Sequence, residues 1–87
     1  MVTNNSNEKH IKLWTPATYR IEVEGHLAES RSDYLAGMRI TVGKRLDQTT
    51  MTTLVGRLKD QAELSGVLNS LYDLRMSILK VEVVNGD

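Results

Sequence analysis

The stretch DQAELSGVLNSLYDL, residues Asp60–Leu74, carries the helix signal on which the predicted fold rests. The Asp60 carboxylate can accept hydrogen bonds from the first turn, and Glu63 can bond back toward the cap, which is the arrangement of a capping box. Apolar side chains then recur at the spacing of one helix face. The stripe by which this helix is predicted to pack on a sheet consists of Leu64, Val67, Leu68, Leu71 and Leu74.

Strands are predicted on both sides of the helix by the alternation of apolar and polar residues. Three of them precede the helix, at Thr18–Glu24, Met38–Val42 and Thr49–Leu58, and Ser77–Val84 follows it. The polar segment His26–Gly37 is predicted to be a long loop with one helical turn. The order β-β-β-α-β predicts an α+β fold in which one helix packs on one face of a four-stranded sheet.

The connections between these elements also predict a strand order. We expect the first three strands to form an antiparallel meander and the last strand to lie parallel to a neighbour, because the helix carries the chain back across the sheet. Gly66 lies inside the helix, where glycine costs about 1 kcal/mol relative to alanine, and we interpret it as a close approach of helix and sheet. In the last strand, the alternation places Leu79, Val81 and Val83 on one face and Ile78, Lys80, Glu82 and Val84 on the other.

Length and charge limit the classes to which the protein can belong. A chain of 87 residues allows one small domain, which we place at 15–87, after a polar N-terminal tail at 1–14 with the composition of a disordered segment. Because 11 basic residues balance 11 acidic ones, bulk charge provides no attraction to nucleic acid or to an anionic membrane. The chain has no apolar run long enough to span a membrane and no apolar signal region near its N-terminus, so we expect a cytoplasmic protein.

Three segments resemble a known pattern: IEVEGHL at Ile21–Leu27, the pair Asp33-Tyr34 followed by Gly37, and LVGRLKDQAELSGVLNSLYDL at Leu54–Leu74. Together they resemble a family of short bacterial proteins with no assigned activity, whose members pair a strand ending in Gly-His-Leu with a Gly-x-Leu-x-Asp-Gln-Ala-x-Leu-x-Gly-x-Leu helix start. The resemblance covers about residues 18–84, and a serine and a tyrosine stand where histidine and tryptophan are common. It implies the same fold, with a closing β-strand, and implies no function.

Residues able to bind a metal or to catalyse a reaction are few. The two imidazoles, His10 and His26, are far apart in the sequence, and neither belongs to a metal-binding motif. His26 with Glu24 and Asp33 would supply only part of a metal site, and the chain has no cysteine to complete it. We therefore expect a non-catalytic protein without metal or cofactor.

Basic residues gather around the second and third predicted strands. They are Arg39, Lys44, Arg45, Arg57 and Lys59, opposed locally only by Asp47. This basic hairpin at 39–59, together with the 26–37 loop, could bind a small ligand or an anion through His26, Arg39, Lys44 and Arg45. The alternative is that Arg39 forms cross-strand pairs with Glu22 or Glu24. Aromatic side chains do not interleave with the cluster, so nucleic-acid binding by base stacking is not predicted.

The third predicted strand carries the main functional hypothesis. TTMTTLVG, at Thr49–Gly56, contains no charge and no proline, and in a meander it would lie at or near an edge of the sheet, where such a composition favours pairing with another chain. We therefore predict a non-catalytic interaction or regulatory module that forms a homodimer, with another protein as a further candidate partner. Its interface is predicted to contain Thr50, Met51, Thr53 and Val55.

Overall fold

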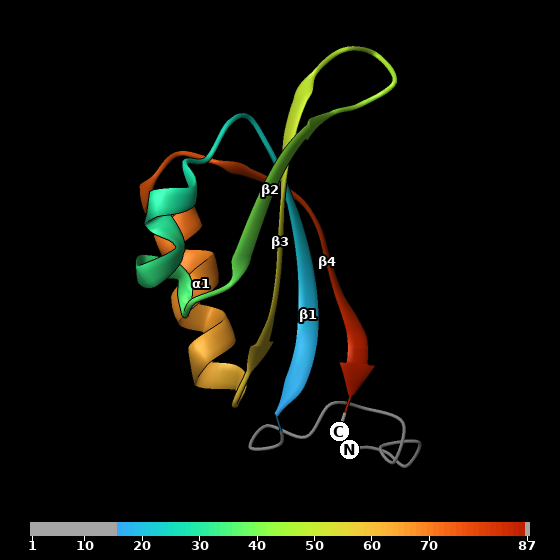
Figure 1. Ribbon diagram of the computed structural model, residues 1–87. Coiled ribbons are helices and arrows are strands. Elements are labelled where there is room, and N and C mark those ends of the chain that lie inside the picture. The colour runs from blue at the N-terminus through green and yellow to red at the C-terminus, as the bar shows by residue number, and fades with distance from the viewer. Residues whose placement is uncertain (1–15, 87) are drawn as a thin grey trace, which may run out of the picture.

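The computed structural model describes residues 16–86 and confirms the predicted α+β fold (Figure 1). The predicted tail at 1–14 lies outside the described residues. A four-stranded sheet carries one main helix and one short 3₁₀-helix on the same side. The elements are β1 (Ala17–Glu24), the 3₁₀-helix η2 (Glu29–Leu35), β2 (Arg39–Lys44), β3 (Thr50–Leu58), α1 (Gln61–Asp73) and β4 (Ser77–Gly86).

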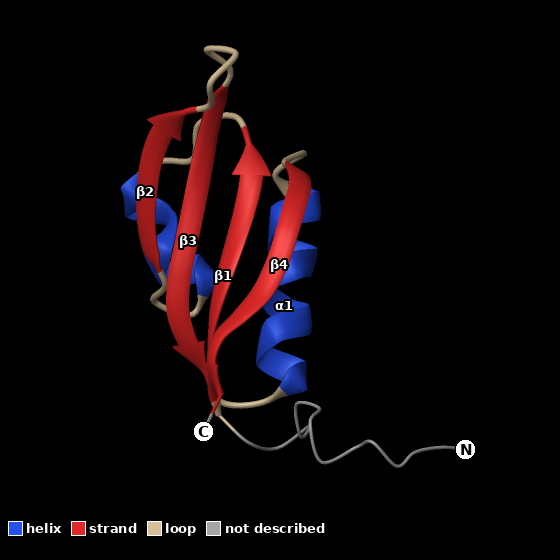
Figure 2. Ribbon diagram, turned by 90° about the vertical axis from the view of Figure 1, so that its right-hand side faces the viewer, coloured by secondary structure: helices blue, strands red, loops and turns tan. Residues whose placement is uncertain are grey.

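The strand order is β2-β3-β1-β4, and every neighbouring pair is antiparallel (Figure 2). The predicted meander is therefore wrong, because β1 pairs with β3 and not with β2. The predicted parallel pairing is wrong as well. β4 runs in the same direction as β3, as a crossover through α1 requires, but β1 lies between the two and pairs with both.

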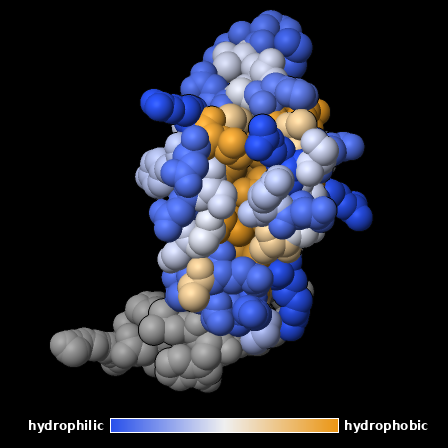
Figure 3. Space-filling view, turned by 90° about the vertical axis from the view of Figure 1, so that its left-hand side faces the viewer, coloured by the Kyte–Doolittle hydropathy of each residue, from blue (hydrophilic) through white to orange (hydrophobic). Residues whose placement is uncertain are grey.

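The core lies between β1 and the helix layer. Alternate residues of β1, namely Ala17, Tyr19, Ile21 and Val23, are buried. From the other side, the predicted helix stripe supplies three buried residues, with Leu68 and Leu74 partly buried beside them. These three are Leu64, Val67 and Leu71. Figure 3, which views the helix layer, shows apolar surface at the middle of this side with polar surface around it.

The long connection between β1 and β2 determines the strand order. Leu27, Leu35 and Met38 of this connection are buried in the same core. The connection therefore lies on the helix side of the sheet, and it does not form a tight turn that would place β2 next to β1. A tight hairpin then joins β2 to β3, and β3 takes the place next to β1. Met38 crosses Gly56 of β3 so closely that a Cβ at Gly56 would lie 2.9 Å from Met38 Cγ and 3.0 Å from Met38 Cα.

The helix begins as predicted. The Glu63 backbone N–H donates to Asp60 Oδ1 at 2.9 Å, and the Lys59 backbone N–H donates to Glu63 Oε1 at 2.9 Å. The side chain of Glu63 thus reaches the residue before the cap. The interpretation of Gly66 is wrong, because a Cβ at Gly66 would have no heavy atom within 4 Å apart from its chain neighbours and the backbone of its own helix. It is Gly56 at which helix-side packing leaves no room for a side chain.

Two irregularities in β4 change the predicted faces of that strand. The pairing of β4 with β1 shifts register between Glu22 and Val23 and again between Thr18 and Tyr19. Because each shift inserts one residue, Ile78 packs against the core and does not face away from it as the alternation predicts. Between the two shifts, Lys80–Val83 pairs regularly with β1.

We predict that Gly56→Ala destabilises the domain by about 1–3 kcal/mol, because the new methyl group forces Met38 and its backbone to move. In a domain of this size, each 1 kcal/mol lowers the melting temperature by roughly 4–8 °C. Thermal unfolding followed by circular dichroism measures this change.

Gly66→Ala is the matched control, since its methyl group meets open space. It should stabilise the protein by up to about 1 kcal/mol through helix propensity. Equal effects of the two substitutions would contradict the packing of Met38 on Gly56.

Candidate functional site

The loop after β1 is held in place by one buried hydroxyl. The Thr52 side chain is fully buried, and its Oγ1 donates a hydrogen bond to the Gly25 carbonyl oxygen at 2.6 Å. The same oxygen accepts a hydrogen bond from the Leu27 backbone N–H at 3.1 Å. Thr52 therefore satisfies two backbone groups that pairing between strands leaves open, and it fixes the direction in which His26 leaves the sheet.

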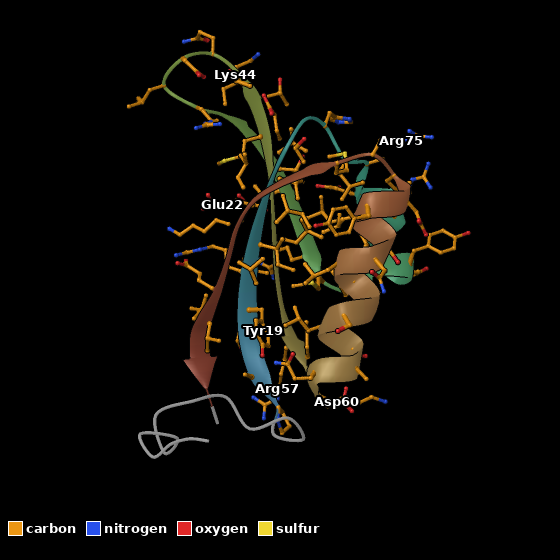
Figure 4. All side chains as sticks on the ribbon, turned by 180° about the vertical axis from the view of Figure 1, so that it is seen from behind. Tyr19, Glu22, Lys44, Arg57, Asp60 and Arg75 are labelled. Carbon is orange, nitrogen blue, oxygen red and sulfur yellow. The ribbon has the colours of Figure 1, made fainter. Side chains whose placement is uncertain are left out.

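An open concavity lies beside this loop. It is lined by His26, Leu27, Ala28, Glu29, Thr41 and Val42. Of the residues predicted to bind an anion, only His26 belongs to this lining. Lys44 lies at the far end of the β2–β3 hairpin (Figure 4), where Arg45 begins the turn, and Arg39 lies at the other end of β2, roughly 17 Å away along the strand. The structure therefore does not gather the predicted anion ligands into one site.

Cross-strand pairing of Arg39 with Glu22 or Glu24 is also wrong. Arg39 lies opposite Val55 of β3, which separates β2 from β1. Glu22 lies on the sheet face away from α1 (Figure 4) and opposite Lys80 of β4.

Within 16–86, no three histidine or acidic side chains lie close enough together to hold a metal ion. In the same range, no helix has the length and apolar character that crossing a membrane would require.

The predicted interface residues of β3 do not lie on an edge. β3 is an inner strand, with β2 on one side and β1 on the other, so its backbone is not open to another chain as the predicted meander requires. Met51, Thr53 and Val55 lie on the outer face, the sheet face opposite α1, whereas Thr50 alternates with them and faces the helix side with buried Thr52. The place of these residues in an interface stays a prediction. Because the backbone of β3 is paired on both sides, only its side chains on the outer face are open to a partner.

The outer face carries a row of charges across β1 and β4. Arg20 of β1 forms an ion pair with Glu82 of β4, and Arg20 Nε donates to Glu82 Oε2 at 2.6 Å. Lys80 Nζ lies 3.3 Å from the other carboxylate oxygen, Glu82 Oε1. The hydrogen bond from Arg20, with a smaller contribution from Lys80, holds the pKa of Glu82 below its ordinary value.

The edge of the sheet formed by β4 combines unpaired backbone with apolar side chains. β4 is bonded to β1 on one side only, so half of its backbone groups have no strand partner in the described residues. Four large apolar side chains along it are 39–50% exposed. We call this surface the β4 edge; its apolar side chains are those of Leu79, Val81, Val83 and Val84.

The opposite edge of the sheet is different. β2 is shorter than β4, it carries Arg39 and Lys44 at its two ends, and only Val42 is a large exposed apolar residue on it. Short length and positive charge are common means of protecting an edge strand from pairing. Sequence patterns do not reveal this contrast, because the position of a strand in the sheet decides whether it is an edge.

Comparison with known proteins adds a family but no activity. A family model described as a domain of unknown function, DUF8691, matches residues 18–82. The chain belongs to this family. The match begins within β1 and ends within β4, so a DUF8691 domain contains the whole order of elements seen here, the central part of the β4 edge included. In the further comparisons, no curated protein and no solved structure matches the chain.

We predict that Thr52→Val destabilises this DUF8691 domain by about 1–3 kcal/mol, although the new side chain has nearly the same shape. The loss of the hydroxyl leaves the buried Leu27 N–H and the half-buried Gly25 carbonyl without their partner. Thermal unfolding measures the change. Thr52→Ser is the control because it keeps the hydroxyl. A larger loss of stability in Thr52→Ser than in Thr52→Val would show that the methyl group of Thr52 contributes more to stability than its hydroxyl group.

A second prediction concerns acid stability. Because the pKa of Glu82 is lowered in the folded protein, its ion pair stabilises the fold above the ordinary pKa of glutamic acid, about 4.3, and this contribution is lost as pH falls through the lowered value. Glu82→Gln should therefore lower the melting temperature at pH 7 and have progressively less effect toward pH 3. Melting curves of both proteins at one protein concentration test this, and a constant difference across the range would contradict it.

Proposed function

We propose that this DUF8691 domain is a non-catalytic interaction module that works as a homo-oligomer, and that the β4 edge is its interaction surface. The observation that carries the proposal is the combination of an open edge strand with four partly exposed apolar side chains along it. Unprotected edges of this kind pair readily with another strand, and isolated monomers usually protect them. The compartment that we propose for it is the cytoplasm of a bacterium, because the sequence patterns predict the cytoplasm and the resemblance described above implies a bacterial protein.

Energetics support association. An 87-residue chain buries a core of modest size, and it has no cysteine with which a disulfide could add stability. Covering the apolar side chains of the β4 edge would add burial at about 25 cal/mol per Å² of apolar surface. Association through this edge would therefore stabilise the fold as well as link two chains.

Charge placement also favours β4 over the other surfaces. The charged residues in the middle of β4, Lys80 and Glu82, lie on the outer face, so neither blocks the apolar row of Val81 and Val83 beside α1. β2 is protected by its two cations. Binding of a small ligand or anion at the concavity beside His26 is the second candidate, but the three predicted cations are absent from its lining.

The expected result is a particle of about twice the 9.8 kDa chain mass, measured by light scattering after size exclusion at micromolar protein concentration. Val81→Lys should shift the mass to that of one chain, because it places a charge in the apolar row of the β4 edge. Its far-UV circular dichroism should match that of the parent protein.

Val42→Lys is the matched control, since Val42 and Val81 are exposed to nearly the same extent, 38% and 41%, and lie on opposite edges of the sheet. It should leave the mass unchanged. If Val55→Lys were monomeric while Val81→Lys remained dimeric, the interaction surface would be the outer face and not the β4 edge. A parent protein that stays monomeric would overturn the proposed function itself.

A further inference from the structure

We propose that the partner on the β4 edge is the β4 strand of a second copy, antiparallel to the first, with the two-fold axis at Val81. This inference rests on the proposed function and adds to it the pairing register and the residues that select the partner. In this register, Val81 meets its own copy, Lys80 lies opposite Glu82 of the other copy, and Glu82 lies opposite Lys80. The two sheets become one continuous sheet of twice the width.

Charge complementarity selects this register. Within one chain, Glu22 lies opposite Lys80 and Arg20 lies opposite Glu82. In the dimer, a row across four strands therefore reads Glu22, Lys80, then Glu82 and Arg20 of the other copy, so the sign of the charge alternates at every step. The two-fold axis produces the same row a second time in reverse order. Opposite charges facing each other across neighbouring strands stabilise a sheet, whereas like charges destabilise it.

The nearest alternative registers lose this complementarity. Moving the axis to Lys80 or to Glu82 places that charged residue opposite its own copy. A shift that pairs Lys80 with Val81 places a charge against the apolar row, because facing residues on antiparallel strands share a side of the sheet. Of these registers, only the one centred on Val81 places each charged residue opposite a residue of the opposite charge.

The apolar residues fit the same register. Val81 and Val83 lie opposite Ile21 and Tyr19, which are buried, so both valines are on the helix side. Pairing about Val81 brings two copies of Val81 together there and places Val83 opposite Leu79 of the other copy, the residue that the register shift inserts without a partner in β1. These are the side chains that are 39–41% exposed in the single chain. The regular segment Lys80–Val83 contains the axis, and the register shifts lie outside it.

Two charge reversals, Lys80→Glu and Glu82→Lys, provide a test that separates pairing from folding. In a self-pair of the Lys80→Glu variant, the new carboxylate faces the carboxylate of Glu82 in the other copy. In a self-pair of the Glu82→Lys variant, the new ammonium group faces the ammonium group of Lys80. Each variant alone should therefore dimerise at least about tenfold more weakly than the parent, because two attractive contacts become two repulsive ones.

An equimolar mixture of the two variants should form a heterodimer with affinity near that of the parent. The new carboxylate at position 80 of one chain then faces the new ammonium group at position 82 of the other, and the unchanged Glu82 of the first chain faces the unchanged Lys80 of the second. Any cost of a substitution to folding within its own chain is the same alone and in the mixture. Recovery on mixing therefore reports contacts between chains.

The measurement is light scattering of each variant alone and of the mixture over a concentration series. Lys44→Glu is the matched control, because it makes the same charge change at the hairpin, far from β4, and should dimerise like the parent. A dimeric parent whose two charge variants also dimerise normally, with no gain on mixing, would overturn the register and leave the proposed function standing. A monomeric parent would overturn both the register and the proposed function, and the β4 edge would then be open to a strand from another protein.

Discussion

The packing of β1 under the apolar stripe of α1 is the interaction on which the rest of the structure depends. Every second residue of β1 is buried against the helix layer, and the strand bonds to a neighbour on each side. β1 lies at an inner position, between β3, which leads into α1, and β4, which follows it. β4 is thereby left at an edge, and β2 is displaced to the other edge by β3.

This arrangement leaves two edges of very different chemistry. The β2 edge is short, charged at both ends and followed by a hairpin turn in which the Thr49 N–H donates to Asp47 Oδ1 at 2.9 Å. The β4 edge is longer, and its apolar side chains remain partly in water. Association through both edges at once would build an open chain of molecules, whereas pairing of β4 with its own copy closes after two. Protection of one edge and exposure of the other are therefore consistent with a closed dimer.

The charged residues of the outer face contribute to the stability of the single chain and also to the choice of pairing register. Arg20, Glu82 and Lys80 form a charged row that already stabilises the pairing of β1 with β4 inside one chain. Exposed ion pairs contribute little energy each, but their arrangement can select one register from several. An apolar strand alone would tolerate slippage by two residues, because such a shift keeps the same side chains on the same face. The charges supply the discrimination that the valines lack.

The local pattern of the sequence determined which residues form the helix and the strands and, for most of these elements, which side chains face the core. The alternation in β1, the Asp60 cap and the stripe from Leu64 to Leu74 depend on neighbours a few residues apart, so they could be predicted without knowledge of the fold. The outer-face position of Met51 and Val55 followed from the same alternation. Membership of the DUF8691 family agrees with the resemblance to a family without an assigned activity.

Strand order was decided only by the tertiary structure. It depends on Leu27, Leu35 and Met38, which enter the core from a connection that looks polar in sequence, and on the room that Gly56 leaves for Met38. The register shifts that turn Ile78 inward arise from pairing with β1, to which β4 is adjacent only after folding. Which strand is an edge, and hence which surface is open to a partner, is a property of contacts between distant residues. Local periodicity carries no information about it, because the same alternating strand can occupy an inner or an outer position in a sheet.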